Sequence, residues 1–314
     1  MRIDINNLAI GYSANNPIVS NINVQVHANE FICLIGSNGI GKSTLQKTIL
    51  GLIPPLKGNI AIMDKNIANY SVQEKARMMS AVLSTPSNNC DLTVEELIGL
   101  GRMPFTNWFG KLNEKDFDLI NSVIEKLHLS KLKNKRFADL SDGEKQKTMI
   151  AKAIVQETPI IVLDEPTAHL DLPTRFEINK QLKQLASNGK KTIISSTHDI
   201  GEALNADKIW MMCNNELISG TPEDLILSKE INKLFPTLIF DDEQETFTLP
   251  NRESANNITI LGEGCRAKWT RHAVERCAIN ATATINVNEN SWTIDNGKDK
   301  INVNSIQDLL KILQ

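Results

Sequence analysis

The sequence predicts an α/β protein built on a parallel sheet, with an antiparallel β-region before it, a helical insertion within it and a small α+β domain after it. Apolar runs at 31–35 and 160–163 and a strand-like segment at 192–196 alternate with helical segments, as parallel strands joined by helices do. The 314 residues exceed the roughly 250–300 at which a single core stops growing, so an added domain is expected. With 41% hydrophobic and 23% charged residues, collagen-like, disulfide-scaffold and disordered classes are excluded.

The first eighty residues predict strands followed by one helix. Apolar residues fall near alternate positions in 3–10 and 21–26, which is typical of a half-exposed antiparallel sheet. The run at 31–35 predicts a buried strand. Residues 42–52 then predict a helix with Leu45, Ile49 and Leu52 on its inner face.

A helical region is expected from about residue 92 to 153. Its segments at 94–100 and 117–127 carry apolar residues at helical spacing, and a third helix follows Ser141. Glu144, three residues after Ser141, completes a capping-box pattern for that third helix.

The alternating pattern then resumes. A strand at 160–163, a helix at 174–187 and strands at 192–196 and 209–212 predict parallel pairing with helices on both faces. Ligands of such sheets bind beyond the carboxyl ends of the strands, so the polar residues after these runs are the candidates for a site.

Composition changes after about residue 240. The polar stretch 241–257 predicts a linker or an exposed hairpin, and 258–314 predicts a small α+β domain. In its helix, Trp269 is expected to pack inward with Ala273 and Cys277. Cys265, His272 and Cys277 match no zinc spacing, so they predict no metal site. The domain's expected strands are 258–261, 282–287, 291–294 and 300–303, and its expected helices are 267–277 and 305–314.

Charge and cysteine usage limit the class of function. The formal net charge of −3 gives no global electrostatic case for nucleic acid. Five scattered cysteines fit reduced thiols, and no apolar run approaches the about 20 residues of a membrane span. The opening residues do not have a signal-peptide pattern, so a cytoplasmic location is expected.

The strongest motif lies between the strand at 31–35 and the helix at 42–52. It fits G-x-x-x-x-G-K-[ST], the phosphate-binding loop in which backbone N–H groups converge on phosphate oxygens. Lys42 is expected to reach the β and γ phosphates of ATP, and Ser43 to place its hydroxyl on Mg²⁺. The predicted ATP-binding residues are Gly36, Ser37, Asn38, Gly39, Ile40, Gly41, Lys42, Ser43 and Thr44.

A second site follows the apolar strand at 160–163. Asp164 and Glu165 point to opposite faces if the strand continues, so they need not share a role. Asp164 is expected to hold Mg²⁺ through water, and Glu165 to orient and deprotonate the attacking water.

A third motif, Leu140 to Glu144, precedes Asp164, and His198 ends the next strand after it. In this order the motifs of residues 1–240 resemble the ATPase subunits of ABC transporters. The resemblance implies a P-loop NTPase with a RecA-like core, an antiparallel β-subdomain and the helical subdomain at about 92–153. It also implies a homodimer in which the ATP of one copy meets the signature of the other, formed by Ser141, Asp142, Gly143 and Glu144.

The resemblance assigns roles to three further residues. Tyr12 is expected to stack on adenine, and His198 to contact the γ-phosphate and the general base as a third catalytic residue beside Lys42 and Glu165. Asp171, in the Ala168–Asp171 segment that corresponds to the family's D-loop, is expected to cross the dimer interface.

Two positions depart from the family pattern. The family's glutamine, a magnesium ligand that also senses the membrane subunit, is replaced here, and Thr85 is the nearest counterpart. Its short hydroxyl reaches less far than an amide. Asp142 replaces a glycine of the signature, and its side chain is expected to turn away because γ-phosphate repels a carboxylate.

The segments 92–98 and 100–104 look like those of importers for iron–siderophore, haem and cobalamin. The resemblance implies an energy-coupling ATPase, peripheral on the inner face of the membrane, with permease subunits in separate chains and a substrate-binding protein as an indirect partner. Two alternatives stay open: a soluble ABC ATPase acting on nucleic acid or ribosomes, and a P-loop kinase or GTPase, which leaves residues 140–144 without a role.

Overall fold

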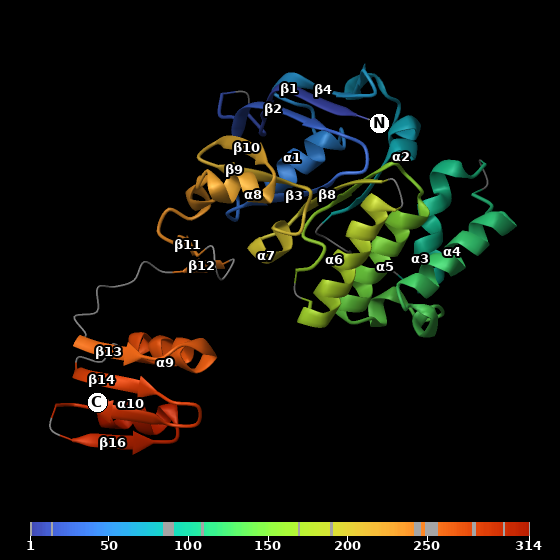
Figure 1. Ribbon diagram of the computed structural model, residues 1–314. Helices are drawn as coiled ribbons and strands as arrows, with labels where there is room; N and C mark the ends of the chain where they lie inside the picture. Colours follow the sequence, from blue (N-terminus) through green and yellow to red (C-terminus); the bar gives the residue numbers. More distant parts are fainter. Residues whose placement is uncertain are drawn as a thin grey trace. The chain divides into compact units, whose positions relative to one another are not determined.

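The computed structural model consists of two compact units, Met1–Thr248 and Leu249–Gln314 (Figure 1). Within the described part of the chain, no helix is long and apolar enough to cross a membrane. The structure describes residues 2–13, 15–83, 91–107, 110–168, 170–188, 191–241, 246–248, 257–277, 281–297 and 299–313.

An antiparallel sheet forms the N-terminal part of the first unit, as the alternating pattern predicts. Its strand order is β2-β1-β4-β5, and the inward-facing residues of β1 and β2 are buried. The strands are β1 (Ile3–Ile10), β2 (Val19–Val26), β4 (Lys57–Ile62) and β5 (Lys65–Asn66).

A six-stranded sheet forms the centre of the same unit, in the order β10-β9-β3-β8-β7-β6. All of its pairings are parallel except that of β9 with β10, and β3, β7 and β8 are completely buried. The predicted parallel sheet is therefore confirmed. Its strands are β3 (Phe31–Gly36), β6 (Met79–Val82), β7 (Ile160–Leu163), β8 (Thr192–Ser196), β9 (Lys208–Cys213) and β10 (Glu216–Gly220).

Helices cover both faces of the central sheet. Helix α1 (Lys42–Ile49) lies between this sheet and the antiparallel one, where Leu45 and Ile49 are fully buried (Figure 1). The other face packs on α6 (Leu172–Ser187), α7 (Ile200–Ala203), α8 (Pro222–Leu227) and η5 (Glu230–Leu234). The expectation for Leu52 is wrong: α1 ends at Ile49, Gly51 turns the chain at φ 67°, and Leu52 is 62% exposed.

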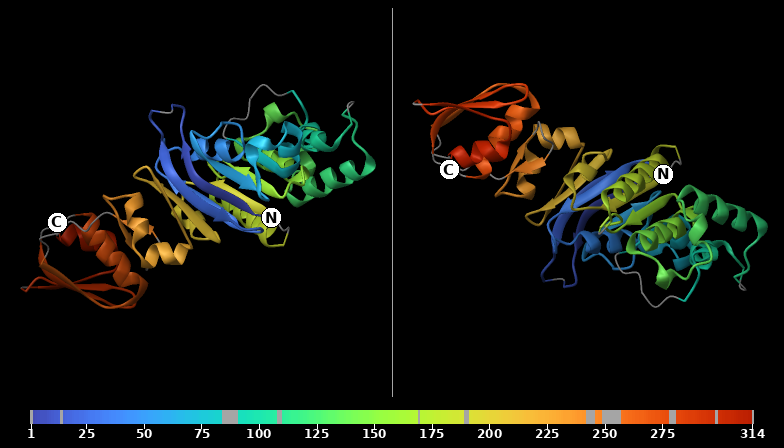
Figure 2. Two further views of the ribbon diagram at one scale, coloured as in Figure 1. Left: turned by 90° about the horizontal axis from the view of Figure 1, so that it is seen from above. Right: turned by 90° about the horizontal axis from the view of Figure 1, so that it is seen from below.

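The helical region has its own core, formed by α3 (Val94–Gly99), α4 (Glu114–Lys126) and α5 (Asp142–Val155). It lies to one side of the central sheet and is green in Figure 2. The first unit also contains a short α-helix, α2 (Val72–Met78), and four short 3-10 helices: η1 (Ile67–Asn69), η2 (Leu100–Phe105), η3 (Ser130–Leu132) and η4 (Phe137–Asp139).

The segment 100–104 has a structural role in this region. Gly101 packs so closely on α5 that a Cβ there would lie 2.4 Å from the carbonyl oxygen of Lys152. The next residue, Arg102, donates to Asp116 of α4 and to the carbonyl of Val155, each at 2.8 Å. These contacts hold η2, α4 and α5 together.

A short hairpin, β11 (Ile239–Asp241) and β12 (Thr246–Thr248), ends the first unit. Phe247 makes edge-to-face contacts with Phe235 and Phe240, at centroid distances of 4.9 and 5.3 Å.

The second unit is the predicted small α+β domain. Its sheet order is β13-β14-β15-β16, parallel for the first pair and antiparallel for the others. The expectation for Trp269 is wrong, because its side chain is 57% exposed, whereas Thr270 is buried and accepts a 2.7 Å hydrogen bond from the indole N–H of Trp292. The elements are β13 (Asn257–Leu261), α9 (Gly264–Arg276), β14 (Thr282–Val287), β15 (Trp292–Asp295), β16 (Lys300–Val303) and α10 (Ile306–Leu313).

Candidate functional site

The glycine-rich loop lies between β3 and α1, at the carboxyl end of the central sheet. Gly41 precedes α1 with φ 109°, and a Cβ there would lie 2.6 Å from the Cγ2 atom of Ile18. Only glycine suits this position. The N-terminus of α1 therefore opens directly onto the loop, with its N–H groups and its favourable dipole for anions.

Lys42 is 5% exposed and is held by the loop that it follows. Its ammonium donates to the carbonyl oxygens of Gly36, at 2.8 Å, and Ser37, at 3.3 Å. Burial lowers the pKa of Lys42, while the nearby carboxylates of Glu165 and Asp164 act in the opposite direction. A phosphate placed in the loop would add the negative charge that favours the ammonium.

Asp164 and Glu165 follow β7 and are joined through one hydroxyl of β8. Ser196, fully buried, donates to Asp164 Oδ1 at 2.8 Å and accepts from the backbone N–H of Glu165 at 2.9 Å. Glu165 has φ 51°, an uncommon conformation for a non-glycine residue. The turn separates the two carboxylates: Asp164 is 3% exposed, whereas the Glu165 side chain is 30% exposed.

His198 lies between the other two predicted catalytic residues. Its Nε2 is 2.5 Å from Glu165 Oε1, and its Nδ1 is 3.4 Å from Lys42 Nζ. An ammonium can only donate, so the consistent assignment is a neutral ring that accepts at Nδ1 and donates from Nε2 to the carboxylate. The structure thus brings Lys42, Glu165 and His198 together.

Tyr12 lies near the start of α1 but is 72% exposed. Its hydroxyl accepts a long, 3.4 Å hydrogen bond from Thr44.

The predicted signature and Asp171 meet at a different cavity. A cavity of about 340 Å³ is lined by Ser141, Asp142, Gly143 and Glu144 together with Lys147, Leu170, Asp171 and Thr174. The capping box is confirmed: Ser141 accepts from the Glu144 N–H, and Glu144 accepts from the Ser141 N–H at 2.8 Å. Asp171 in turn caps α6 by accepting from the Thr174 N–H at 2.9 Å.

Two other cavities adjoin the glycine-rich loop and the catalytic residues. One of about 260 Å³ is lined in part by Gly36, Ser37, Asn38 and His198, and one of about 270 Å³ by Glu165, His198 and Arg175. Among the described residues, none that lines the signature cavity lines either of these.

Known proteins match both units of this chain. A family model described as ABC transporter matches residues 19–168, and one described as iron ABC transporter C-terminal domain matches 255–314. An uncharacterized ABC transporter ATP-binding protein of Methanocaldococcus jannaschii is 34% identical over 275 residues, which cover 86% of this chain and 94% of that protein. The chain belongs to the ABC transporter ATP-binding family. It is therefore a nucleotide-binding ATPase.

Two further similarities lie within the same family. The petrobactin import ATP-binding protein FpuC of Bacillus anthracis is 31% identical over 240 residues, covering 75% of this chain and 88% of FpuC. An inward-facing structure of an ABC transporter assigned to the metal-chelate type is 25% identical with a TM-score of 0.64, covering 78% of this chain and 94% of that one.

Two residues of this ABC ATPase that complete its site are not apparent from its motifs. Ser196 and Gln46 each contact the end of β7, although they come from β8 and α1. The signal that could have identified them is a polar residue within an apolar pattern. Such a residue is expected to be buried, and a buried polar side chain requires a hydrogen-bond partner. Thr85, predicted near magnesium, and His169 of the D-loop segment lie outside the described residues.

Proposed function

We propose that this ABC ATPase is the energy-coupling subunit of an importer for iron–siderophore, haem or cobalamin-type chelates. The observation that carries the proposal is a combination within one chain. Lys42, Glu165 and His198 lie together, and the same chain has a domain that matches the iron ABC transporter C-terminal model. The names of two similar proteins, a petrobactin importer ATPase and a metal-chelate type transporter, support this substrate class.

The chemistry proposed for the site is hydrolysis of ATP by positioned water. Lys42 binds the β and γ phosphates beside the N–H groups of residues 36–44, and Tyr12 stacks on adenine. Glu165 accepts the proton of the attacking water. The 2.5 Å contact with Nε2 of His198 orients the Glu165 carboxylate, and His198 contacts the γ-phosphate once ATP is bound.

Magnesium fits the donors that this site offers. A hydroxyl and a carboxylate are hard oxygen ligands, and Ser43 and Asp164, with Thr85 as a third candidate, would hold the ion. Its bound charge would neutralise the phosphates. We expect chelation by EDTA to abolish hydrolysis and added Mg²⁺ to restore it.

A second copy of the chain completes each site in this proposal. Ser141 to Glu144 line a cavity separate from the one at the glycine-rich loop, so a single copy does not bring the two together. In a two-fold homodimer, the N-terminus of α5 in one copy faces the phosphates held by the other, and Asp171 crosses the interface. The Asp142 side chain turns away from those phosphates.

The remaining partners proposed are integral membrane permease subunits in separate chains. ATP-driven closure of the dimer and its reopening move the permease, to which the ATPase binds from the inner face of the membrane. The substrate-binding protein acts on the ATPase only through the permease.

The decisive variant is Glu165→Gln, with Glu125→Gln on the exposed face of α4 as the matched control. Glu165→Gln is expected to keep ATP affinity, to lose hydrolysis and to accumulate as an ATP-bound dimer in light scattering, because it keeps the shape of the side chain without the base. Glu125→Gln should hydrolyse normally. Normal turnover by Glu165→Gln contradicts the assignment of the base.

The alternative, a soluble ABC ATPase acting on nucleic acid or ribosomes, makes a different prediction. The net charge of −3 disfavours it. Purification from detergent-solubilised membranes should recover the chain with a permease. Recovery with ribosomes or DNA, and with no membrane protein, would favour the alternative.

The domain division proposed is an ATPase of residues 1–240 with its helical subdomain at about 92–153, a connection at 241–257 and a C-terminal domain at 258–314. The division into two compact units at residue 248 supports it. A chain ending after residue 250 should fold and hydrolyse ATP. If hydrolysis still responds to substrate in this truncated chain, the C-terminal domain is not its regulator.

A further inference from the structure

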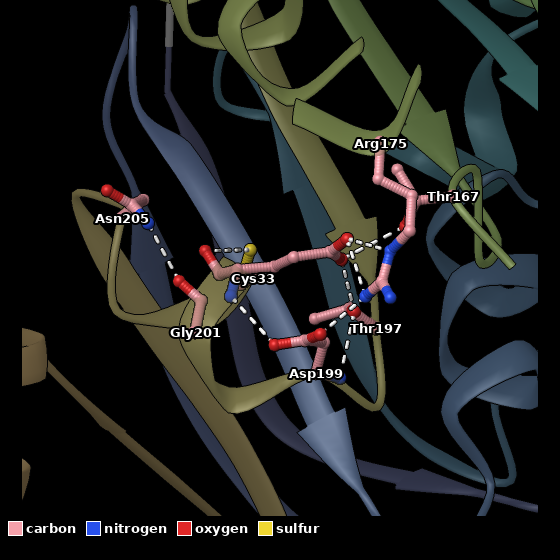
Figure 3. Close-up of polar contacts among 8 residues, drawn as sticks. Cys33, Thr167, Arg175, Thr197, Asp199, Gly201 and Asn205 are labelled. Carbon is pink, nitrogen blue, oxygen red and sulfur yellow. Dashed lines mark hydrogen bonds and ion pairs between the residues drawn. The ribbon is translucent and has the colours of Figure 1, made fainter. Parts of the chain in front are cut away.

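Arg175 joins the beginning of α6 to the segment that follows β8. Its guanidinium contacts the carboxylate of Asp199 and donates from Nε and Nη2 to Oε1 of Glu202, both at 3.2 Å. In Figure 3 the guanidinium of Arg175 and the carboxylate of Asp199 point toward each other. The guanidinium thus holds the carboxylate of Asp199, at the start of α7, and that of Glu202, within α7.

Glu202 is the centre of the cluster and its side chain is only 11% exposed. While Oε1 accepts from Arg175, Oε2 accepts from the hydroxyls of Thr167, at 3.0 Å, and Thr197, at 2.5 Å. Both oxygens of this buried carboxylate are therefore satisfied, as burial of a charge requires. Asp199, besides contacting Arg175, accepts from the Glu202 N–H and caps α7.

Four members of the cluster lie close in the sequence to residues with a proposed role at the site. Thr197 and Asp199 directly flank His198, and Thr167 follows Glu165 by two positions. Arg175 itself follows Asp171 by one turn of helix, since both belong to the start of α6. The cluster therefore connects the three segments that carry Glu165, Asp171 and His198.

We propose that Arg175 is a positioning residue that couples the start of α6 to the loop carrying His198, and so fixes His198 against Glu165. The inference rests on the roles proposed for Glu165 and His198. In this inference Arg175 acts through Asp199 and Glu202, the two carboxylates that it contacts.

The charges explain why removal of this one side chain affects the loop. Without the guanidinium, Asp199 and Glu202 would face each other as two negative groups in a partly buried place, and their repulsion would open the loop. Burial lowers the pKa of Arg175, but its bonds to Asp199 and Glu202 outweigh this and raise the pKa overall. The cation is therefore retained at all ordinary pH values.

Lys183 provides a matched control on the same helix. Its ammonium donates to the carbonyl oxygen of Asn205 at 2.7 Å, so it also ties α6 to the segment around α7. It does so away from His198. A role limited to holding these elements together would make Arg175→Gln and Lys183→Gln equivalent.

The test compares steady-state ATP hydrolysis by the full chain in three variants. Arg175→Gln is expected to lower kcat ten- to a hundredfold, on the order expected for misplaced catalytic groups, with the KM for ATP within about twofold of the parent chain. Lys183→Gln should leave both constants unchanged. Arg175→Lys should recover part of kcat, because it keeps the positive charge but not the planar guanidinium that binds two carboxylates at once.

The position of His198 gives a readout independent of the rate. In a chain labelled with ¹⁵N-histidine, the imidazole resonances of His198, assigned through His198→Gln, should shift in Arg175→Gln and stay in place in Lys183→Gln. If Arg175→Gln does not fold, the Arg175→Lys variant carries both measurements.

Three results would overturn the inference: an unchanged kcat in Arg175→Gln, an equal loss in Lys183→Gln, or unchanged His198 resonances. Failure of the proposed function is a separate result, because it appears as absence of ATP hydrolysis in the parent chain itself.

Discussion

The side-chain amide of Gln46 donates a 2.8 Å hydrogen bond to the carbonyl oxygen of Leu163, the residue that precedes Asp164. Gln46 is fully buried in α1, and its Oε1 atom has no hydrogen-bond partner among the described residues. The helix that follows the glycine-rich loop is thereby tied to the strand end that carries the two carboxylates.

The Gln46→Glu variant tests this tie. At pH 8 the introduced carboxylate cannot donate to Leu163 and places a charge in the core, so we expect a loss of about 3 kcal/mol in the free energy of unfolding. Burial raises the pKa of a carboxyl, and its neutral form can donate, so the loss should shrink at pH 5. Urea denaturation at both pH values measures it, with Gln184→Glu on the exposed face of α6 as control. A loss that does not depend on pH contradicts the geometry.

Ser196→Ala tests the hydroxyl that joins Asp164 to the Glu165 backbone. We expect kcat for ATP to fall about tenfold, since the Asp164 carboxylate loses a donor and the Glu165 backbone N–H loses an acceptor. The free energy of unfolding should fall by about 1–3 kcal/mol. The matched control is Ser195→Ala, which removes an equally buried hydroxyl from the adjacent position in β8. Equal kinetic effects in the two variants would refute a specific role for Ser196.

Tyr12→Ala tests adenine stacking. Loss of base–aromatic stacking costs about 1–3 kcal/mol, so the Kd for ATP should rise about tenfold, while Tyr12→Phe should bind as the parent chain does. Titration calorimetry measures both. Inorganic tripolyphosphate, which has no base, should bind all three chains equally, and a weaker affinity of Tyr12→Ala for it would place Tyr12 at the phosphates instead.

Glu144→Gln tests the capping box at the start of α5. The Ser141 backbone N–H is the main cause that lowers the Glu144 pKa below its usual value of 4.5. A lowered carboxyl pKa contributes stability that is fully present above the unfolded value and is lost as pH falls through the folded one. The parent chain should therefore melt above the variant near neutral pH, and this difference should shrink as pH falls below 4.5 and vanish once the pH is below the lowered pKa of the folded state. A constant difference across that range would exclude the ionised cap.

Much of the fold and of the site could be predicted because the signals are local. An apolar run such as 160–163, the spacing of Gly36 to Ser43 and the Ser141–Glu144 pair each report interactions between residues a few positions apart. The expectations for Leu52 and Trp269 failed for the opposite reason. Helical periodicity could not say where α1 ends, or which side of α9 the second unit's sheet covers.

The sequence by itself determined the family, the parallel sheet and the separate C-terminal domain, and it predicted which residues form the site. Only the tertiary structure decided which of those residues meet. The contacts of Glu165 with His198, Ser196 with Asp164 and Gln46 with Leu163 join segments 32 to 117 positions apart. They exist because β7, β8 and β3 lie side by side in that order, and strand order is set by packing across the whole sheet rather than by any local pattern.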